Sequence, residues 1–235
     1  MKTRTTIRTI CLILIGVNIL FSFGCKKSED NNTPAPTGVT DADGNVYSTV
    51  TIGTQVWMVE NLKTTKFNDG TSIPLVTDNT WGTLTTPAYC WYNNDESMKV
   101  VYGAVYNWFT VNTGKLAPKG WHVASDAEWS ALIAFLGGEA IAGGKLKSVG
   151  TIEAGTGLWI EPNTGATNLS GFSAYPGGYR NSSGFQQISM HGYWWTSTVN
   201  GATTSWVYDM SYDNAGAFRN FSAKTDGYHV RCVKD

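Results

Sequence analysis

The chain has 235 residues, of which 15% are charged and 13% are aromatic, and it contains 26 Gly. Its 17 Lys and Arg are matched by 18 Asp and Glu, and no basic stripe is present, so we expect no nucleic-acid partner. The many glycines favour turns and short strands over long helices.

The first 24 residues have the pattern of a secretory signal peptide. A basic start precedes an apolar run from Ile10 to Phe23, and the small residue Gly24 stands directly before Cys25. The run is shorter than the roughly 20 apolar residues of a membrane-spanning helix. Because a cysteine after a small residue resembles a bacterial lipobox, we expect Cys25 to be acylated; the alternative is an ordinary signal peptide with an incidental cysteine. The membrane would then be a partner through the lipid anchor.

Residues 25–40 follow as a polar, proline-containing segment with almost no large apolar side chains. Such a segment cannot bury enough surface to fold, so we expect a flexible tether. Residues 41–235 are long enough for one domain with its own core. This order predicts a secreted, lipid-anchored protein at the outer membrane or cell surface of a Gram-negative bacterium.

The first elements of this domain are a turn and a hairpin. The turn lies at Asp41–Asn45, and β-rich segments at 46–52 and 55–58 flank Gly53 and Thr54. A glycine at the first central position suits a two-residue type II′ turn.

Two helices are expected next. Apolar residues at helical spacing predict the first over 100–111, and Ser125 with Glu128 three residues later predicts a capped helix over 125–136. After Gly143 the helical pattern gives way to short strand candidates. The sequence thus predicts an α+β class, with two helices packed on small antiparallel sheets and long Gly/Asn-rich loops.

Eight segments carry a resemblance to a known family. They are IGTQVWMVENLKT (52–64), AYCWYNND (88–95), YGAVYNW (102–108), APKGWHVASDAEW (117–129), GGKLK (143–147), PNTGATNLSGFSAYPGGYRN (162–181), GYWWTST (192–198) and GYHVRCVKD (227–235). Together they resemble the Fibrobacter succinogenes major paralogous domain, which occurs in secreted proteins and lipoproteins. The resemblance implies a C-type-lectin-like fold, related to that of the formylglycine-generating enzymes.

Catalytic activity is not expected. The formylglycine-generating relatives use a closely spaced cysteine pair, whereas here Cys90 and Cys232 lie far apart in the sequence. The three histidines are isolated, and neither a metal-binding HExxH nor a GxSxG motif is present.

Cys90 and Cys232 allow two interpretations. In an oxidising compartment two remaining cysteines often pair, and we favour a disulfide between them. The alternative is two buried free thiols that behave as small apolar side chains.

No cofactor is expected, although two segments resemble parts of calcium sites. Asp41–Asn45 has the composition of a calcium loop without its closing Glu. The triplet Glu161-Pro162-Asn163 is similar to the sugar-selecting triplet of calcium-dependent lectins, but no Trp-Asn-Asp motif follows it.

Aromatic residues are the candidate ligand contacts, since their rings stack on the apolar faces of sugars. The candidates are Tyr179, Arg180, Trp194, Trp195 and Trp206. The alternative is that most of these rings belong to the core. We expect a binding module for an extracellular glycan or protein; the alternatives are a structural envelope lipoprotein and an enzyme distantly similar to formylglycine-generating oxidases.

Overall fold

The computed structural model describes residues 38–235. This part is mostly β: 14 strands form four sheets with antiparallel ladders, accompanied by four α-helices. The predicted α+β class, with two helices packed on small sheets in a C-type-lectin-like fold, is therefore wrong. Many of the short segments between turns form strands, as in the β3–β4 hairpin, so strands outnumber helices among the described residues.

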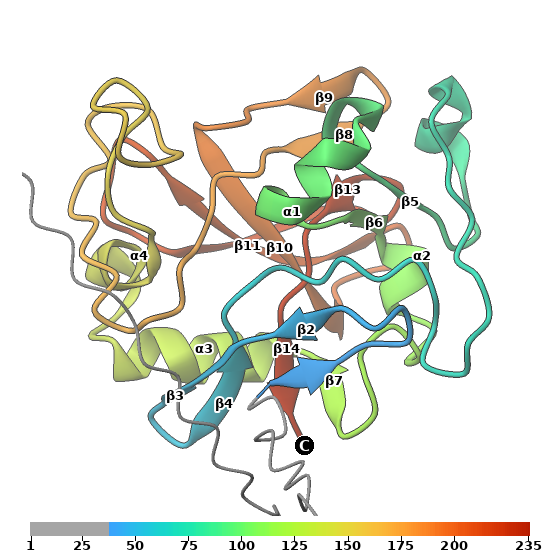
Figure 1. Ribbon diagram of the computed structural model, residues 1–235, viewed down its shortest axis with the longest axis horizontal. Coiled ribbons are helices and arrows are strands. Elements are labelled where there is room, and N and C mark those ends of the chain that lie inside the picture. Colours follow the sequence, from blue (N-terminus) through green and yellow to red (C-terminus); the bar gives the residue numbers. More distant parts are fainter. Residues whose placement is uncertain (1–37) are drawn as a thin grey trace, which may run out of the picture. The chain divides into compact units, whose positions relative to one another are not determined.

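The sheets combine segments from distant parts of the chain (Figure 1). The two-stranded sheet consists of β1 (Val39–Thr40) and β2 (Val46–Tyr47). The four-stranded sheet has the order β3 (Thr49–Ile52), β4 (Gln55–Met58), β14 (Cys232–Lys234), β7 (Trp121–Val123). The five-stranded sheet has the order β5 (Tyr89–Cys90), β6 (Val105–Asn107), β13 (Gly227–Tyr228), β8 (Tyr179–Asn181), β9 (Gly184–Gln186). The three-stranded sheet has the order β10 (His191–Val199), β11 (Thr204–Ser211), β12 (Phe218–Ala223).

Strand β1 lies in the segment that the sequence assigned to the tether. Val39 pairs with Tyr47 and Thr40 with Val46, so the ordered body begins before Asp41. The predicted signal peptide and Cys25 lie outside the described residues. Within residues 38–235, no helix is both long and apolar enough to cross a membrane.

The helices differ from prediction in number and position. They are α1 (Lys99–Tyr102), α2 (Trp108–Val111), α3 (Asp126–Phe135) and α4 (Glu139–Leu146), with 3-10 turns at Asn79–Thr83, Tyr92–Asn94 and Glu96–Met98. The single helix predicted over 100–111 is wrong, because Gly103 adopts a φ of 76° and the chain continues as β6.

The helix predicted from its cap and the hairpin are confirmed. In α3 the Ser125 hydroxyl accepts a hydrogen bond from the Glu128 N–H, and the Glu128 carboxylate accepts one from the Ser125 N–H. Strands β3 and β4 pair from Thr49–Met58 to Ile52–Gln55, with Gly53 at a φ of 62° in the turn. Both signals are local in the sequence, which is why they could be read from it.

Strand β10 separates two large hydrophobic clusters, because successive side chains of a strand point to opposite faces. Trp195 lies in one cluster and donates its indole N–H to the Tyr106 carbonyl oxygen at 2.9 Å. Trp194 lies in the other cluster with Trp129 and donates to the Asn61 side-chain oxygen at 2.8 Å. Figure 1 shows α3 beneath β10 and β11, where it covers the second cluster.

Candidate functional site

Three of the five candidate ligand contacts are buried. Trp194 and Trp195 are 0% exposed and Arg180 is 3% exposed. Their burial favours the alternative interpretation, in which both tryptophan rings belong to the core, and it leaves none of the three facing solvent. Tyr179 and Trp206 are partly exposed, but they lie on different surfaces.

Arg180 holds a loop in place instead of facing solvent. Its Nη1 donates to the Val76 carbonyl oxygen at 2.7 Å, and its Nη2 donates to the carbonyl oxygens of Thr77 and Asp78 at 3.1 and 2.6 Å. Its guanidinium lies 4.6 Å from the centre of the Trp81 ring. These partners lie about a hundred positions before Arg180 in the sequence, so the Gly-rich segment around Arg180 does not predict them.

Tyr179 belongs to a group of side chains that we call the Tyr–His cluster: Tyr179 on β8, His191 and Tyr193 on β10, Asp209 on β11 and Tyr228 on β13. The Tyr193 ring is central, with its centroid 5.3 Å from that of Tyr179 and 5.2 Å from that of Tyr228. His191 stacks on Tyr193 at 5.4 Å and an interplanar angle of 11°. Tyr179, Tyr193 and His191 are partly exposed, whereas Tyr228 is buried beneath them.

Polar groups lie directly beside these rings. Asp209 faces Tyr193 across the β10–β11 ladder and accepts a hydrogen bond from the side chain of the exposed Asn220. Burial raises the pKa of Asp209, against the opposing effects of Asn220 and His191. The Tyr193 hydroxyl donates to the Gln187 side-chain oxygen at 2.7 Å. The cluster thus combines ring faces with the buried carboxyl of Asp209 and with the amides of Asn220 and Gln187.

Burial favours the neutral form of the His191 ring. Burial lowers its pKa, although the nearby carboxyls of Asp209 and Asp213 act in the opposite direction. A neutral imidazole offers one donor and one acceptor nitrogen. His191 is isolated in the sequence because its neighbour Asp209 lies on another strand, and the sequence does not disclose how these strands pair.

Trp206 lies on a second surface, beside β12. The Arg219 guanidinium lies 3.5 Å from its ring centroid and forms two 2.7 Å hydrogen bonds to the carboxylate of Asp126. Phe221, which is 62% exposed, meets Trp206 edge to face at a centroid distance of 6.3 Å. One face of the indole is thus occupied by the chain's own arginine, which leaves it less free for a ligand.

In the described part of the chain Cys90 and Cys232 are free and buried, so the disulfide predicted between them is absent. They lie in different hydrophobic clusters, on strands of different sheets, so the fold does not bring the two sulfur atoms together. Burial raises the pKa of Cys90 to about 11 and raises that of Cys232 further. The thiols are therefore protonated at neutral pH and fill space as small apolar side chains.

The two calcium-like segments have other structural roles. The Asp41 carboxylate accepts hydrogen bonds from the N–H groups of Asp43 and Asn45 and from the Tyr47 hydroxyl, which closes the turn. The Asn163 side chain points inward and donates to two carbonyl oxygens. In the part of the chain that the structure describes, no three His, Cys, Asp or Glu residues gather as metal ligands would.

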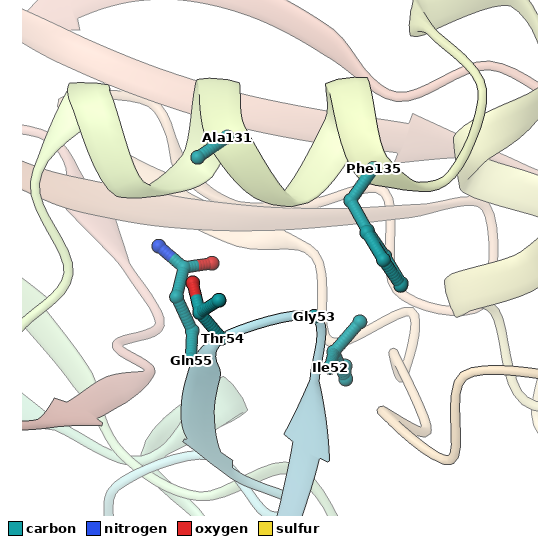
Figure 2. Close-up of a pocket in the computed structure, with 6 residues that line it drawn as sticks. All are labelled: Ile52, Gly53, Thr54, Gln55, Ala131 and Phe135. Carbon is teal, nitrogen blue, oxygen red and sulfur yellow. The ribbon is translucent and has the colours of Figure 1, made fainter.

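A groove of about 440 Å³ lies between the β3–β4 hairpin and α3 (Figure 2). Phe135, which is 65% exposed, points from α3 toward Gly53 and Ile52, and Gln55 extends toward Ala131. None of the lining side chains carries a charge: Ile52, Gly53, Thr54, Gln55, Ala131 and Phe135. The groove therefore offers fewer directional contacts than the Tyr–His cluster.

A comparison with protein-family models matches residues 50–234 to the family described as Fibrobacter succinogenes major domain. This match confirms the resemblance drawn from the sequence and includes every residue of the Tyr–His cluster. No curated protein matches the chain, and no solved structure matches it.

Proposed function

We propose that this chain, which belongs to the Fibrobacter succinogenes major domain family, is a lipid-anchored extracellular binding module that recognises a saccharide at the Tyr–His cluster. The observation that carries the proposal is the set of partly exposed rings of Tyr179, Tyr193 and His191 beside polar groups. Sugars present apolar C–H faces flanked by hydroxyls, so this combination matches both parts of their chemistry.

The cluster is also held rigidly, as a recognition surface requires. The β10–β11 ladder fixes Tyr193 opposite Asp209, and the buried Tyr228 supports the Tyr193 ring from below. The Tyr228 hydroxyl forms a 2.8 Å hydrogen bond with that of Ser222. Binding would therefore cost little ordering of these side chains, which favours affinity.

We propose binding without catalysis. The thiols of Cys90 and Cys232 are buried and protonated, so neither can act as a nucleophile or resemble a reactive cysteine pair. His191 contacts the Ser211 hydroxyl at 3.4 Å, but that hydroxyl donates to Asp213 and so is not activated by the histidine.

Anchoring through Cys25 at the outer membrane or cell surface is part of this proposal. Each buried lipid CH₂ contributes about 0.8 kcal/mol, so two or more acyl chains would hold the module at a bilayer durably. When the full chain is expressed in a Gram-negative host with radiolabelled palmitate, we expect label on the wild type and on Cys11→Ala, and none on Cys25→Ala. Unlabelled wild type, or label that persists on Cys25→Ala, would contradict acylation at this residue.

The saccharide proposal is tested by binding of the chain from Lys26 onward to arrays of glycans and cell-wall polysaccharides. We expect a bound saccharide whose affinity falls about tenfold in Tyr179→Ala, which removes one stacking ring. Phe135→Ala, which removes an exposed ring elsewhere, should leave the affinity unchanged. The absence of binding to every saccharide would refute the proposal, and so would equal affinities for wild type and Tyr179→Ala.

A further inference from the structure

Within residues 38–235, strand β12 has an unpaired edge. Among the described residues, the sheet order β10-β11-β12 leaves β12 hydrogen-bonded to β11 alone, through six consecutive residue pairs from Phe218–Asp209 to Ala223–Thr204 without a bulge. The backbone groups of Phe218–Ser222 form no other hydrogen bond in the described part of the chain. Alternate N–H and C=O groups of a regular strand therefore point outward, ready to pair with another strand.

This edge lacks the features that usually prevent strand pairing. Native edge strands are protected by lysine, proline or bulges, and β12 (FRNFSA) has none of them. Its one charged side chain, Arg219, is neutralised by the two hydrogen bonds to Asp126. The Asn220 amide is held by Asp209. The edge consequently carries no uncompensated charge that would repel an identical edge.

Both faces of the strand expose aromatic surface. Phe221 lies directly opposite Trp206 in the register, on the face that contacts α3, and is 62% exposed. Phe218 lies opposite Asp209, on the face of the Tyr–His cluster, and is 38% exposed. A further strand along this edge would cover both rings while it satisfied the backbone, so burial of apolar surface and hydrogen bonding act together.

We propose that the occupant of this edge is β12 of a second copy, paired antiparallel to form a continuous six-stranded sheet. An antiparallel pair of identical strands is self-complementary about a two-fold axis, and a neutral, aromatic edge is compatible with its own copy. A two-fold axis perpendicular to the sheet places the same face of both copies on the same side. The two Tyr–His clusters then face one way, which would allow a polymeric ligand to engage both.

The test is the molar mass of the chain from Lys26 onward, which retains every described residue, by light scattering and sedimentation equilibrium at tens of micromolar. We expect twice the chain mass for wild type and for Phe135→Lys, and the single-chain mass for Phe221→Lys. Both substitutions replace an exposed phenylalanine by lysine, so they differ only in the surface that they alter. Circular dichroism serves as the control that each variant is folded.

Hydrogen exchange provides a second, independent readout. In the wild type, alternate amides of residues 218–223 should exchange slowly at high concentration and faster on dilution, and in Phe221→Lys they should exchange fast at both. A monomeric wild type would overturn the proposal. A dimer that survives Phe221→Lys, or one that Phe135→Lys dissociates, would overturn it as well, because the interface would then lie elsewhere. None of these outcomes depends on saccharide binding.

Discussion

Replacing Arg231 by methionine is expected to lower the free energy of unfolding by about 3 kcal/mol or more. This arginine is 0% exposed, and its guanidinium donates to the Asn61 side-chain oxygen at 2.7 Å and to the carbonyl oxygens of Phe172 and Ser173 at 2.9 Å. It also donates to the Met58 carbonyl oxygen at 2.9 Å. The residue thus connects β4, the 172–173 segment and the last strands.

The size of this effect follows from what methionine would leave behind. Burial lowers the pKa of Arg231 to about 9, so the charge itself is costly to desolvate. When a buried charge and its partners are all replaced by apolar groups, stability can be unchanged. Here most partners are backbone carbonyls, which no substitution removes, and each would be left buried without a donor.

Urea unfolding of wild type and Arg231→Met measures this loss. Arg219→Met is the matched control, since Arg219 makes two hydrogen bonds to Asp126 at the surface and its loss should cost no more than about 1 kcal/mol. An Arg231→Met variant as stable as Arg219→Met would show that the buried guanidinium does not hold these segments together.

Trp129→Ala should destabilise the fold by about 3–5 kcal/mol. Its ring is 0% exposed and stacks on Tyr208 at a centroid distance of 5.1 Å and an angle of 15°. It also meets Trp57 at 5.1 Å, Phe172 at 5.6 Å and Trp194 at 5.9 Å. Because α3 packs on β10 and β11 through this ring, its removal leaves a cavity at the centre of the second cluster.

Trp129→Phe separates ring packing from hydrogen bonding. The Trp129 indole N–H is buried and has no hydrogen-bond partner among the described residues. Phenylalanine keeps much of the ring contact and removes this unsatisfied donor. We therefore expect Trp129→Phe to lower the free energy of unfolding much less than Trp129→Ala does. Thermal and urea unfolding of the two variants provide the comparison. Equal losses would show that the position is not dominated by packing against Tyr208 and its neighbours.

Signals confined to a few neighbouring residues could be predicted from the sequence. Ser125 and Glu128 identified the start of α3, and Gly53 identified the turn of the β3–β4 hairpin. The helical spacing over 100–111 led to a wrong prediction for two reasons. Spacing alone does not show that Gly103 adopts a positive φ. It also does not show that β6, which lies in this segment, pairs with β5 and β13. Tertiary pairing overrode the local pattern.

The candidate site required knowledge of strand pairing. Tyr179 was among the predicted contacts, but His191 and Asp209 were not, since their proximity depends on the β10–β11 register and on β8 lying beside them. Trp194 and Trp195 were candidate contacts with a place in the core as the alternative, and apolar side chains pack against both faces of β10. A sequence shows the alternation of a strand but not whether its second face is also covered.

Saccharide recognition is tested most directly by NMR. The chemical shifts of the histidine ring protons are followed while the protein is titrated with a saccharide selected from the array. The chain contains 3 His, so His122 and the buried His229 serve as internal references. We predict that the His191 signals shift as the ligand stacks beside Tyr193, while the other two remain in place. Signals of His191 that stay unchanged at saturating saccharide would contradict recognition at the Tyr–His cluster.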